Sequence, residues 1–319
     1  MKVERAFAVA WRVAGHVPEP VLRAVATIGA DAAWLRRGTG VRQLERNLAR
    51  VRPDASRREL RQLSRAGMRS YSRYYRETFA LSSYPPERIA ARGRMVGGEP
   101  VRAELAAGRT VLMALGHTGN WDLAGAFATV QLGHVTTVVE RLEPEALYQE
   151  FLEFRQGLGI TIIALDGSGG DVFRQLVRAV RGGPTLLPLL ADRDLTARGI
   201  EVDLFGARAR VAVGPAALAV STGAMLLAAG IYYERLHGDR RRAAGSPWGI
   251  VLDFGPPVTV PTDLPRAEQL MVMTQSWVDA VGAGIAAHPQ DWHMLQKIFV
   301  EDLDPARYAE TRTEAEGPA

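Results

Sequence analysis

The sequence lacks cysteine altogether and has almost no lysine. With no cysteine in 319 residues, disulfide bonds, cysteine-ligated zinc and thiol nucleophiles are excluded. Lys2 and Lys297 are the two lysines, so arginine supplies every other basic side chain. Arginine suits two-pronged binding of phosphate and carboxylate groups, although a GC-rich genome produces the same bias without any functional meaning.

Long apolar runs are also missing. No window reaches the ~18–20 uncharged apolar residues that a transmembrane helix needs, and the N-terminus MKVERAFAVAWRVAG has no signal-peptide cleavage site. We therefore expect a soluble protein that stays on the cytosolic side. The hydrophobic share of 47% and the charged share of 23% are typical of a packed globular protein, and the length allows one large α/β domain or two small ones.

The motifs of two common kinds of catalysis are absent as well. The chain has no G-x-S-x-G serine elbow, and DGSGG at 166–170 fits better as the loop before a helix. The six histidines show no metal-ligand spacing, so we expect no metal. His288 and His293 lie near the end of a predicted helix, where capping or packing is the expected role.

Residues 1–92 have the periodicity of helices. In PVLRAVATIGADAAWL the apolar positions step by four and three, which places them on one helical face; they are Val21, Val25, Ile28, Ala32 and Leu35. Trp11 and Trp34 lie in or near this amphipathic segment. The pattern predicts an N-terminal helical part that precedes the rest of the fold.

A stripe of arginines follows at the same spacing between residues 56 and 79. Its members are Arg58, Arg61, Arg65, Arg69, Arg73 and Arg76. One interpretation is a solvated helix face above a core. Another is a helix pair lying on anionic lipid head groups, with tryptophan and tyrosine at the interface. A third is a nucleic-acid-binding surface, which the absence of any base-reading motif disfavours.

From residue 110 onward, short apolar runs alternate with helical patterns. We predict strands at 110–116, 135–140, 160–165, 185–190 and 225–236, and helices at 120–132, 143–159, 169–183, 214–224 and 262–288. This rhythm predicts an α/β fold with a central, largely parallel sheet flanked by helices on both faces. The segment 237–247, HGDRRRAAGSP, is predicted to be a mobile hairpin loop.

The stretch GHTGNWDLAG places a histidine directly after the first of these strands. His117 then lies at a strand end, where sites of parallel sheets collect, and Asp122 falls in the first turn of the next helix. An imidazole there can take a proton from a bound hydroxyl, and a nearby carboxylate can hold the ring tautomer. The first amides of the helix can stabilise a developing oxyanion.

A histidine–aspartate pair without a protein nucleophile indicates direct attack by a substrate hydroxyl on an activated thioester. The alternative is purely structural: His117 is then a hydrogen-bonded strand-end histidine, and Asp122 only interacts favourably with the helix dipole. The short H-x4-D spacing alone does not decide between these two interpretations, and the context of the motif must do so.

GHTGNWDLAG after a strand resembles the H-x4-D box of the glycerolipid acyltransferase superfamily. Several further segments resemble the branch that contains the late acyltransferases of lipid A synthesis: the arginine-rich helical N-terminus, EFRQGLGI before an apolar strand, LLADRD, and VDLFGARARVAVGPAALAVSTGA. The resemblance spans roughly residues 20–300. Within this branch the chain is most similar to the actinobacterial enzymes that acylate phosphatidylinositol mannosides, and the ending HPQDWHMLQ adds to that similarity.

This resemblance implies transfer of a long acyl chain, typically palmitoyl, from acyl-CoA to a mannose 6-hydroxyl of a phosphoinositide glycolipid. It implies no metal and no cofactor beyond acyl-CoA as co-substrate. Another lipid acceptor, such as a lipid A precursor or glycerol phosphate, and a catalytically inactive lipid-binding protein are the alternatives. The expected organisation is one domain over 1–319, with a membrane-associating helical part at 1–92 and a catalytic core at 93–305, peripheral on the cytoplasmic face of an anionic membrane.

The resemblance also assigns roles to single residues. It implies that His117 is the general base and that Asp122 is the aspartate of the motif. Glu201 matches a carboxylate close to the catalytic histidine, and whether Asp122 or Glu201 contacts the ring stays open. Glu140 matches an acidic residue near the acceptor sugar and Arg155 a basic site residue.

Further arginines are candidates for binding lipid or CoA phosphates: Arg155, Arg193, Arg208 and Arg210. Each assignment has a plain alternative. Glu140 can belong to a solvated strand end, and Arg155 to an exposed helix face. Asp192, Arg193 and Asp194 can form a loop ion network, while Arg208 and Arg210 alternate with apolar residues as in an edge strand.

Overall fold

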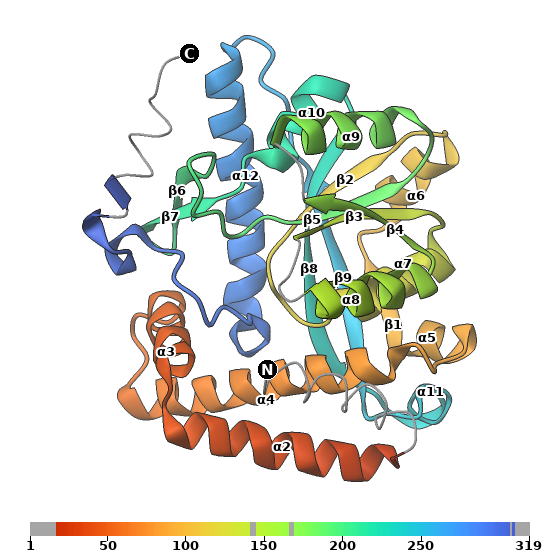
Figure 1. The fold of residues 1–319 in the computed structure, drawn as a ribbon, viewed down its shortest axis with the longest axis vertical. Coiled ribbons are helices and arrows are strands. Elements are labelled where there is room, and N and C mark those ends of the chain that lie inside the picture. Colours follow the sequence, from red (N-terminus) through yellow and green to blue (C-terminus); the bar gives the residue numbers. More distant parts are fainter. Residues whose placement is uncertain (1–16, 141–144, 166–168, 307, 310–319) are drawn as a thin grey trace.

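A computed structural model describes residues 17–140, 145–165, 169–306 and 308–309. Its centre is a seven-stranded sheet with the strand order β1-β9-β8-β2-β5-β3-β4 (Figure 1). The strands are β1 (Gly93–Val96), β2 (Val111–Leu115), β3 (Val135–Glu140), β4 (Ile160–Leu165), β5 (Leu186–Leu190), β8 (Met225–Arg235) and β9 (Trp248–Pro257). A separate antiparallel hairpin is formed by β6 (Ile200–Leu204) and β7 (Ala207–Val211).

The sheet is parallel over most of its width. Strands β8, β2, β5, β3 and β4 run in one direction, while β9 pairs antiparallel with β8 and β1 pairs parallel with β9. The expectation of a largely parallel α/β sheet after an N-terminal helical segment is therefore confirmed. Because parallel strands end at one edge, β2 and β5 bring their carboxyl ends together in the middle of the sheet, with Leu115 opposite Leu190.

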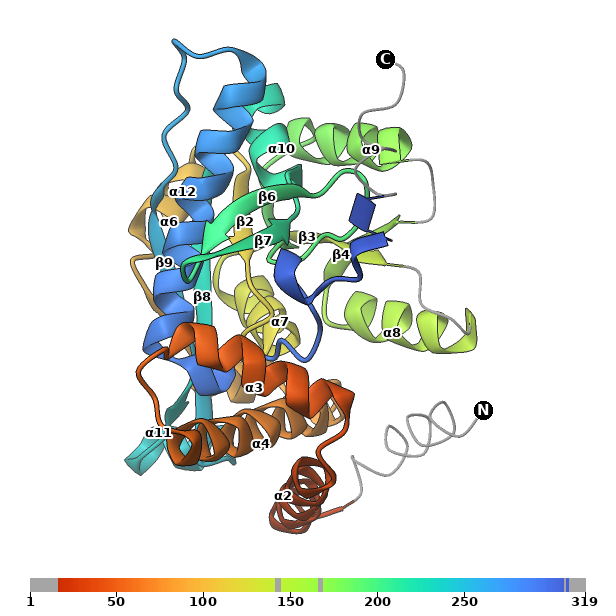
Figure 2. The ribbon, with the colours of Figure 1, turned by 90° about the vertical axis from the view of Figure 1, so that its left-hand side faces the viewer.

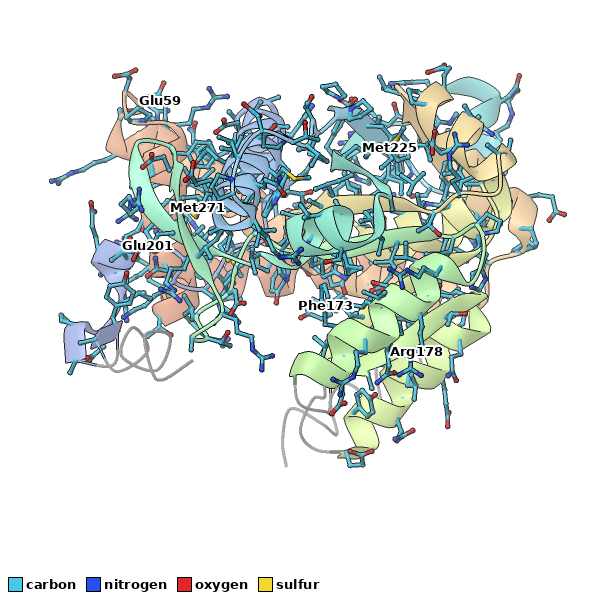
Figure 3. All side chains as sticks on the ribbon, turned by 90° about the horizontal axis from the view of Figure 1, so that it is seen from above. Glu59, Phe173, Arg178, Glu201, Met225 and Met271 are labelled. Atoms are coloured by element: carbon cyan, nitrogen blue, oxygen red, sulfur yellow. The ribbon has the colours of Figure 1, made fainter. Side chains whose placement is uncertain are left out.

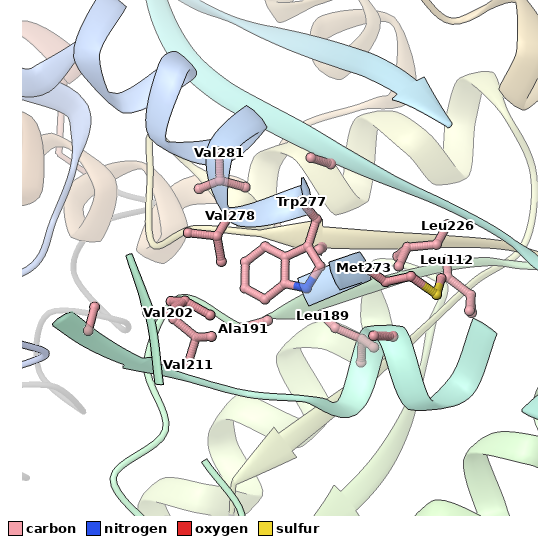
Figure 4. Close-up of a cluster of buried hydrophobic side chains, with 14 of the residues drawn as sticks. Leu112, Leu189, Ala191, Val202, Val211, Leu226, Met273, Trp277, Val278 and Val281 are labelled. Carbon is pink, nitrogen blue, oxygen red and sulfur yellow. The ribbon is translucent and has the colours of Figure 1, made fainter. Parts of the chain in front are cut away.

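The central strands are buried on both faces because their side chains alternate between two apolar cores. In β2, Leu112 and Ala114 belong to one buried cluster, and Val111, Met113 and Leu115 to the other. Helices α9 (Gly169–Arg181), α10 (Gly214–Thr222) and α12 (Arg266–Ala287) cover the first face (Figure 4), and α5 (Pro86–Arg92), α6 (Glu99–Ala106), α7 (Trp121–Gln131) and α8 (Glu145–Gly157) cover the second. Figure 4 shows Trp277 of α12 at the centre of the first cluster.

Helix α12 is the one helix of the described residues that is long and apolar enough to cross a bilayer by length and composition. The expectation that no segment reaches this threshold was therefore wrong for this helix. Its Met273, Trp277, Val281 and Ile285 lie in the core against the sheet, whereas Met271 and Val272 are exposed. One face of α12 thus packs in the protein core.

The connection between β8 and β9 differs from the expected mobile loop. Residues of HGDRRRAAGSP form a short helix, α11 (Gly238–Ala244), whose Ala244 carbonyl accepts a hydrogen bond from Arg88 of α5. Arg240 also donates to the Ala91 carbonyl at 3.0 Å. The hairpin connectivity was predicted correctly, but the loop was not, because its helix is held by partners that lie about 150 residues away in the sequence.

The N-terminal helices α2 (Glu19–Arg36), α3 (Thr39–Val51) and α4 (Arg57–Leu81) form a layer beneath the sheet. Both ribbon views place α2 outermost, with α4 between it and the rest of the fold (Figures 1 and 2). The apolar residues that the sequence placed on one face of α2 are exposed: Val21 51%, Val25 64%, Ile28 69% and Leu35 68%. This face therefore has no protein partner among the described residues, which is typical of an interaction surface.

The arginine stripe of α4 is only partly engaged by the neighbouring helices. Arg65 and Arg69 each form two hydrogen bonds with Asp31 of α2, although their side chains stay 44% and 41% exposed. Arg76 is buried between Glu19 of α2 and Glu77. The stripe thus fastens α2 to α4 and also leaves part of its charge at the surface.

Candidate active site

His117 lies in the loop between β2 and α7. Strand β2 ends at Leu115, and Asn120 caps α7 by accepting a hydrogen bond from the Leu123 amide at 2.9 Å. The loop turns sharply at Gly119, whose φ of +58° is in the left-handed region. A Cβ at this position would lie 2.6 Å from the carbonyl oxygen of Ile231 on β8. Glycine is therefore required for the loop to pass close to the neighbouring strand.

The imidazole of His117 is paired with Asp192, which follows the neighbouring strand β5. Nδ1 of His117 lies 2.5 Å from Oδ1 of Asp192. The second carboxylate oxygen, Oδ2, accepts hydrogen bonds from the His117 backbone amide at 3.0 Å and from Nε1 of Trp292 at 3.1 Å. Three donors therefore fix a carboxylate that is only 2% exposed, while 34% of the His117 side chain stays accessible.

The electrostatics of this pair suit a base. Burial by itself lowers the pKa of His117, but the charge of Asp192 and the hydrogen bond to it outweigh burial, so the pKa is raised. Burial raises the pKa of Asp192, but the charge and hydrogen bonds of His117 lower it overall. Because an ionised carboxylate can only accept, Nδ1 of the neutral ring carries the proton and Nε2 presents its lone pair.

The segment after α12 forms hydrogen bonds with the loop that carries His117. The Gly119 amide donates to the Asp291 carbonyl at 2.8 Å, and the His293 amide donates to the His117 carbonyl at 2.8 Å. The His293 ring is buried near Ser70, and burial together with the charges of Arg73 and His117 lowers its pKa to about 3. His293 is thus a neutral packing residue, and His288 ends α12 and stacks on Tyr232 with ring centroids 3.7 Å apart.

Asp122 has different partners from those that the motif suggests. Its Oδ2 accepts from the Tyr74 hydroxyl at 2.8 Å and its Oδ1 from Nε of Arg155 at 2.7 Å. The carboxylate is 2% exposed. It therefore joins α7 to α4 and α8, and the structure brings Arg155 to the motif aspartate rather than to an exposed helix face.

The remaining carboxylate candidate, Glu201, lies on the β6–β7 hairpin. Figure 3 shows it on the opposite side of the view from Arg178 of α9. Its carboxylate contacts Arg208 at 3.4 Å and the hydroxyl of Tyr308.

The two arginines of the hairpin differ in exposure. Arg208 is half exposed, whereas Arg210 is buried and donates to the carbonyls of Thr196 and Gly199, both at 2.7 Å. Arg210 thereby holds the loop that follows Asp192.

Comparison with known proteins shows the family of this chain. The family model described as bacterial lipid A biosynthesis acyltransferase matches residues 3–301. The chain belongs to this acyltransferase family. It is 37% identical over 310 residues to a phosphatidylinositol mannoside acyltransferase of Mycobacterium tuberculosis (strain CDC 1551 / Oshkosh), covering 97% of this chain and 92% of that protein. It is 36% identical over 309 residues to the protein of the same name from Mycolicibacterium smegmatis, covering 96% and 94%.

The remaining predicted binding residues are Arg193 and Glu140. Arg193 adjoins Asp192, and its charge lowers the pKa of His117 slightly against the stronger opposite effect of Asp192. It donates through Nε to the Lys297 carbonyl at 3.4 Å. Glu140 ends β3, but its side chain lies outside the described residues, as does all of Arg141.

Asp192, the partner of His117, is a residue that sequence reasoning placed in a loop ion network. A signal for its role was present: His117 and Asp192 each stand two residues after an apolar run that ends at Leu115 or Leu190. The pairing of these two runs was not available from the pattern, because β2 and β5 are separated by two other strands in the sequence. Adjacent parallel strands deliver the two side chains to one point.

Proposed function

We propose that this enzyme transfers a long acyl chain, palmitoyl, from acyl-CoA to a mannose 6-hydroxyl of a phosphatidylinositol mannoside, with His117 as general base. The observation that carries the catalytic part is the His117–Asp192 pair at 2.5 Å, next to an accessible imidazole edge. The similarity to two proteins named phosphatidylinositol mannoside acyltransferase supports a phosphatidylinositol mannoside as the acceptor.

The proposed reaction needs no covalent enzyme intermediate. Nε2 of His117 takes the proton of the sugar hydroxyl as its oxygen attacks the thioester carbonyl carbon. The carbon–sulfur bond of the resulting tetrahedral intermediate then breaks, and the departing CoA thiolate recovers the proton from the imidazolium. Asp192 stabilises the imidazolium through its hydrogen bond to Nδ1, and the products are the acylated sugar and free CoA.

The first turn of α7, beside His117, presents partial positive charge to the tetrahedral intermediate. Asn120 caps the amide of Leu123, so Trp121 and Asp122 provide the other first-turn amides of α7. These amides and the positive end of the helix dipole favour a developing oxyanion near the loop. Asp122 acts on the geometry of this turn by tying α7 to Tyr74 and Arg155.

Attachment to the membrane is assigned to the exposed apolar face of α2. Val21, Val25, Ile28 and Leu35 point away from α4, to which α2 is tied by Asp31 and other polar contacts. An amphipathic helix of this kind lies in the plane of a membrane interface with its apolar side inserted. A peripheral position on the cytoplasmic leaflet would give the enzyme access to a lipid-borne acceptor.

The acceptor is tested by mass spectrometry of the lipids formed from palmitoyl-CoA. The enzyme is incubated separately with a phosphatidylinositol mannoside, a lipid A precursor and glycerol phosphate. We expect one added palmitoyl group on the mannoside and none on the other two acceptors. Acylation of only a lipid A precursor or glycerol phosphate would refute the acceptor assignment while leaving the acyltransferase chemistry intact.

A further inference from the structure

A cavity of about 270 Å³ lies away from His117, between α4 and the ends of β8 and β9. Its walls carry three arginines of α4 that are spaced by one helical turn, Arg65, Arg69 and Arg73. Ser70, Tyr233, Trp248 and Gln290 are further lining residues. The cavity thus combines positive charge, neutral hydrogen-bond donors and one flat aromatic wall.

The charges around this cavity are not balanced among the described residues. Arg65 and Arg69 share the single carboxylate of Asp31. The guanidinium of Arg73 forms no hydrogen bond or ion pair with any described residue, and it lies 3.7 Å from the ring centroid of Trp248 and 4.5 Å from that of Tyr233. Its five donors are therefore available to a ligand.

The acidic groups near Arg73 are already engaged. Asp291 lines the cavity, but its oxygens accept from the Ser70 hydroxyl at 2.7 Å and from the Tyr233 amide at 2.9 Å. Burial raises the pKa of this carboxyl, while its hydrogen bonds and the charge of Arg73 oppose that rise. Glu77 is buried and pairs with Arg92 at 2.6 Å. Neither carboxylate neutralises Arg73 by direct contact.

A second guanidinium strengthens the positive potential at the aromatic wall. The guanidinium carbon of Arg235, on the exposed end of β8, lies 4.0 Å from the Trp248 ring centroid. Arg235 also forms no hydrogen bond or ion pair within the described part of the chain. Two cations held against one indole attract an anion more strongly than either does alone.

We propose that this cavity binds the phosphate group of a membrane lipid head group, with Arg73 as its central ligand. The lipid source rests on the proposed membrane contact of α2. Arg65 and Arg69 reach Asp31 on the side of α2 opposite its exposed apolar face. Arg65 and Arg69 thus connect the cavity wall with the helix that is proposed to contact the membrane.

One short segment connects this cavity with the loop that carries His117. Gln290 and Asp291 line the cavity, and the Asp291 carbonyl accepts the hydrogen bond from Gly119 that holds the loop of His117. Residues 290 and 291 therefore connect the cavity with the loop of His117.

The test measures head-group binding by the full chain, apart from acyl transfer. Binding of glycerophosphoinositol and of inorganic phosphate is followed by calorimetry at constant ionic strength. Sedimentation then compares phosphatidylcholine vesicles with vesicles that also contain phosphatidylinositol. The variants are Arg73→Met, Arg73→Lys, and Arg58→Met as the matched control, because Arg58 is an exposed arginine of the same helix outside the cavity.

We expect Arg73→Met to weaken glycerophosphoinositol binding about tenfold or more, as loss of charge-assisted hydrogen bonds implies. Arg73→Lys should lose part of the affinity, and it remains informative if Arg73→Met does not fold. Arg58→Met should change the affinity by less than about twofold, as for an exposed charge. Equal losses in Arg58→Met and Arg73→Met, or no saturable binding of either soluble probe, would overturn the site.

The two probes separate the possible sources of the phosphate. Saturable binding of inorganic phosphate without any Arg73-dependent gain on phosphatidylinositol vesicles would overturn the lipid assignment. Failure of the α2 contact is recognised separately, because Ile28→Glu would then leave vesicle sedimentation unchanged. Binding of the soluble head group does not depend on that contact.

Discussion

Replacing Asp192 with asparagine tests the tautomer that catalysis needs. Oδ2 of Asp192 receives two N–H donors, from the His117 backbone and from Trp292. In Asp192→Asn the amide oxygen must remain at these donors, because an NH₂ group there would face two other donors. The NH₂ group then faces Nδ1 of His117 and donates to it. The proton of the neutral ring moves to Nε2, where the lone pair is needed.

The expected loss follows from two effects. Loss of the charged partner removes a charge-assisted hydrogen bond to the imidazolium, worth about 1.5–3 kcal/mol, which corresponds to roughly 10- to 100-fold in rate. The wrong tautomer adds a further penalty, because the ring must rearrange before it accepts a proton. We expect kcat to fall by roughly 10³–10⁴-fold in total, as for other histidine–aspartate pairs.

The assay is release of free CoA at saturating acyl-CoA and acceptor over a range of pH. Asp122→Asn is the matched control, because it makes the same chemical change in a buried carboxylate that contacts Tyr74 and Arg155 instead of His117. We expect the control to keep the acid limb of the wild-type pH profile, which is the fall in the rate of CoA release at low pH. Wild-type kcat in Asp192→Asn, or an acid limb that moves only in Asp122→Asn, would refute the assignment of Asp192.

Three further outcomes follow from the structure. The pKa of His117 is raised, and the protonated ring cannot act as a base. We therefore expect kcat/KM to fall as the pH drops through an apparent pKa above ~6.5. A fall in kcat/KM only below that value contradicts the pairing. Ile28→Glu should weaken sedimentation with anionic vesicles, whereas Val130→Glu, at another exposed apolar site, should not; equal effects contradict the α2 contact. Gly108 and Gly119 both have positive φ, but only Gly119 has a close neighbour. Urea unfolding should therefore show a cost of about 1–2 kcal/mol for Gly108→Ala and a larger one for Gly119→Ala, and equal costs would contradict the steric argument.

The central sheet was predictable because its strands carry an uninterrupted apolar signal. In VLMAL and LLPLL nearly every residue faces one of two cores, and only a buried parallel strand needs that pattern. The strand at 248–257 and the short one at 93–96 were not predicted. They contain glycine, proline or charge, and their strand state depends on pairing with β8 and with each other, which is a property of the assembled sheet.

The sequence singled out one half of the proposed catalytic pair. His117 stood out because a strand delivers it to a turn and a helix start, an arrangement that sequence shows directly. Its partner depends on strand order, and β5 follows β2 in space but not in the sequence. The motif spacing favoured Asp122, yet a residue in the first turn of α7 points toward α4 and α8, where Tyr74 and Arg155 bind it.

The N-terminal helices show that sequence periodicity identifies a helix face but not its partner. The spacing of Val21, Val25 and Ile28 identifies one apolar face of α2 but does not say what covers it, and the structure leaves that face exposed. The arginine stripe of α4 suggested a surface for lipids, and Asp31 and Glu19 of α2 pair with three of its arginines. Only the tertiary contacts show which arginines have a carboxylate partner.

The rate of CoA release by a His117→Gln variant tests the central claim most directly. Glutamine keeps a polar side chain of similar reach but cannot accept a proton from a hydroxyl at neutral pH. We predict that a folded His117→Gln enzyme, still able to sediment with anionic vesicles, releases CoA in the presence of the mannoside acceptor at least about 10²-fold more slowly than wild type. Release at the wild-type rate would contradict the role of His117 as the base.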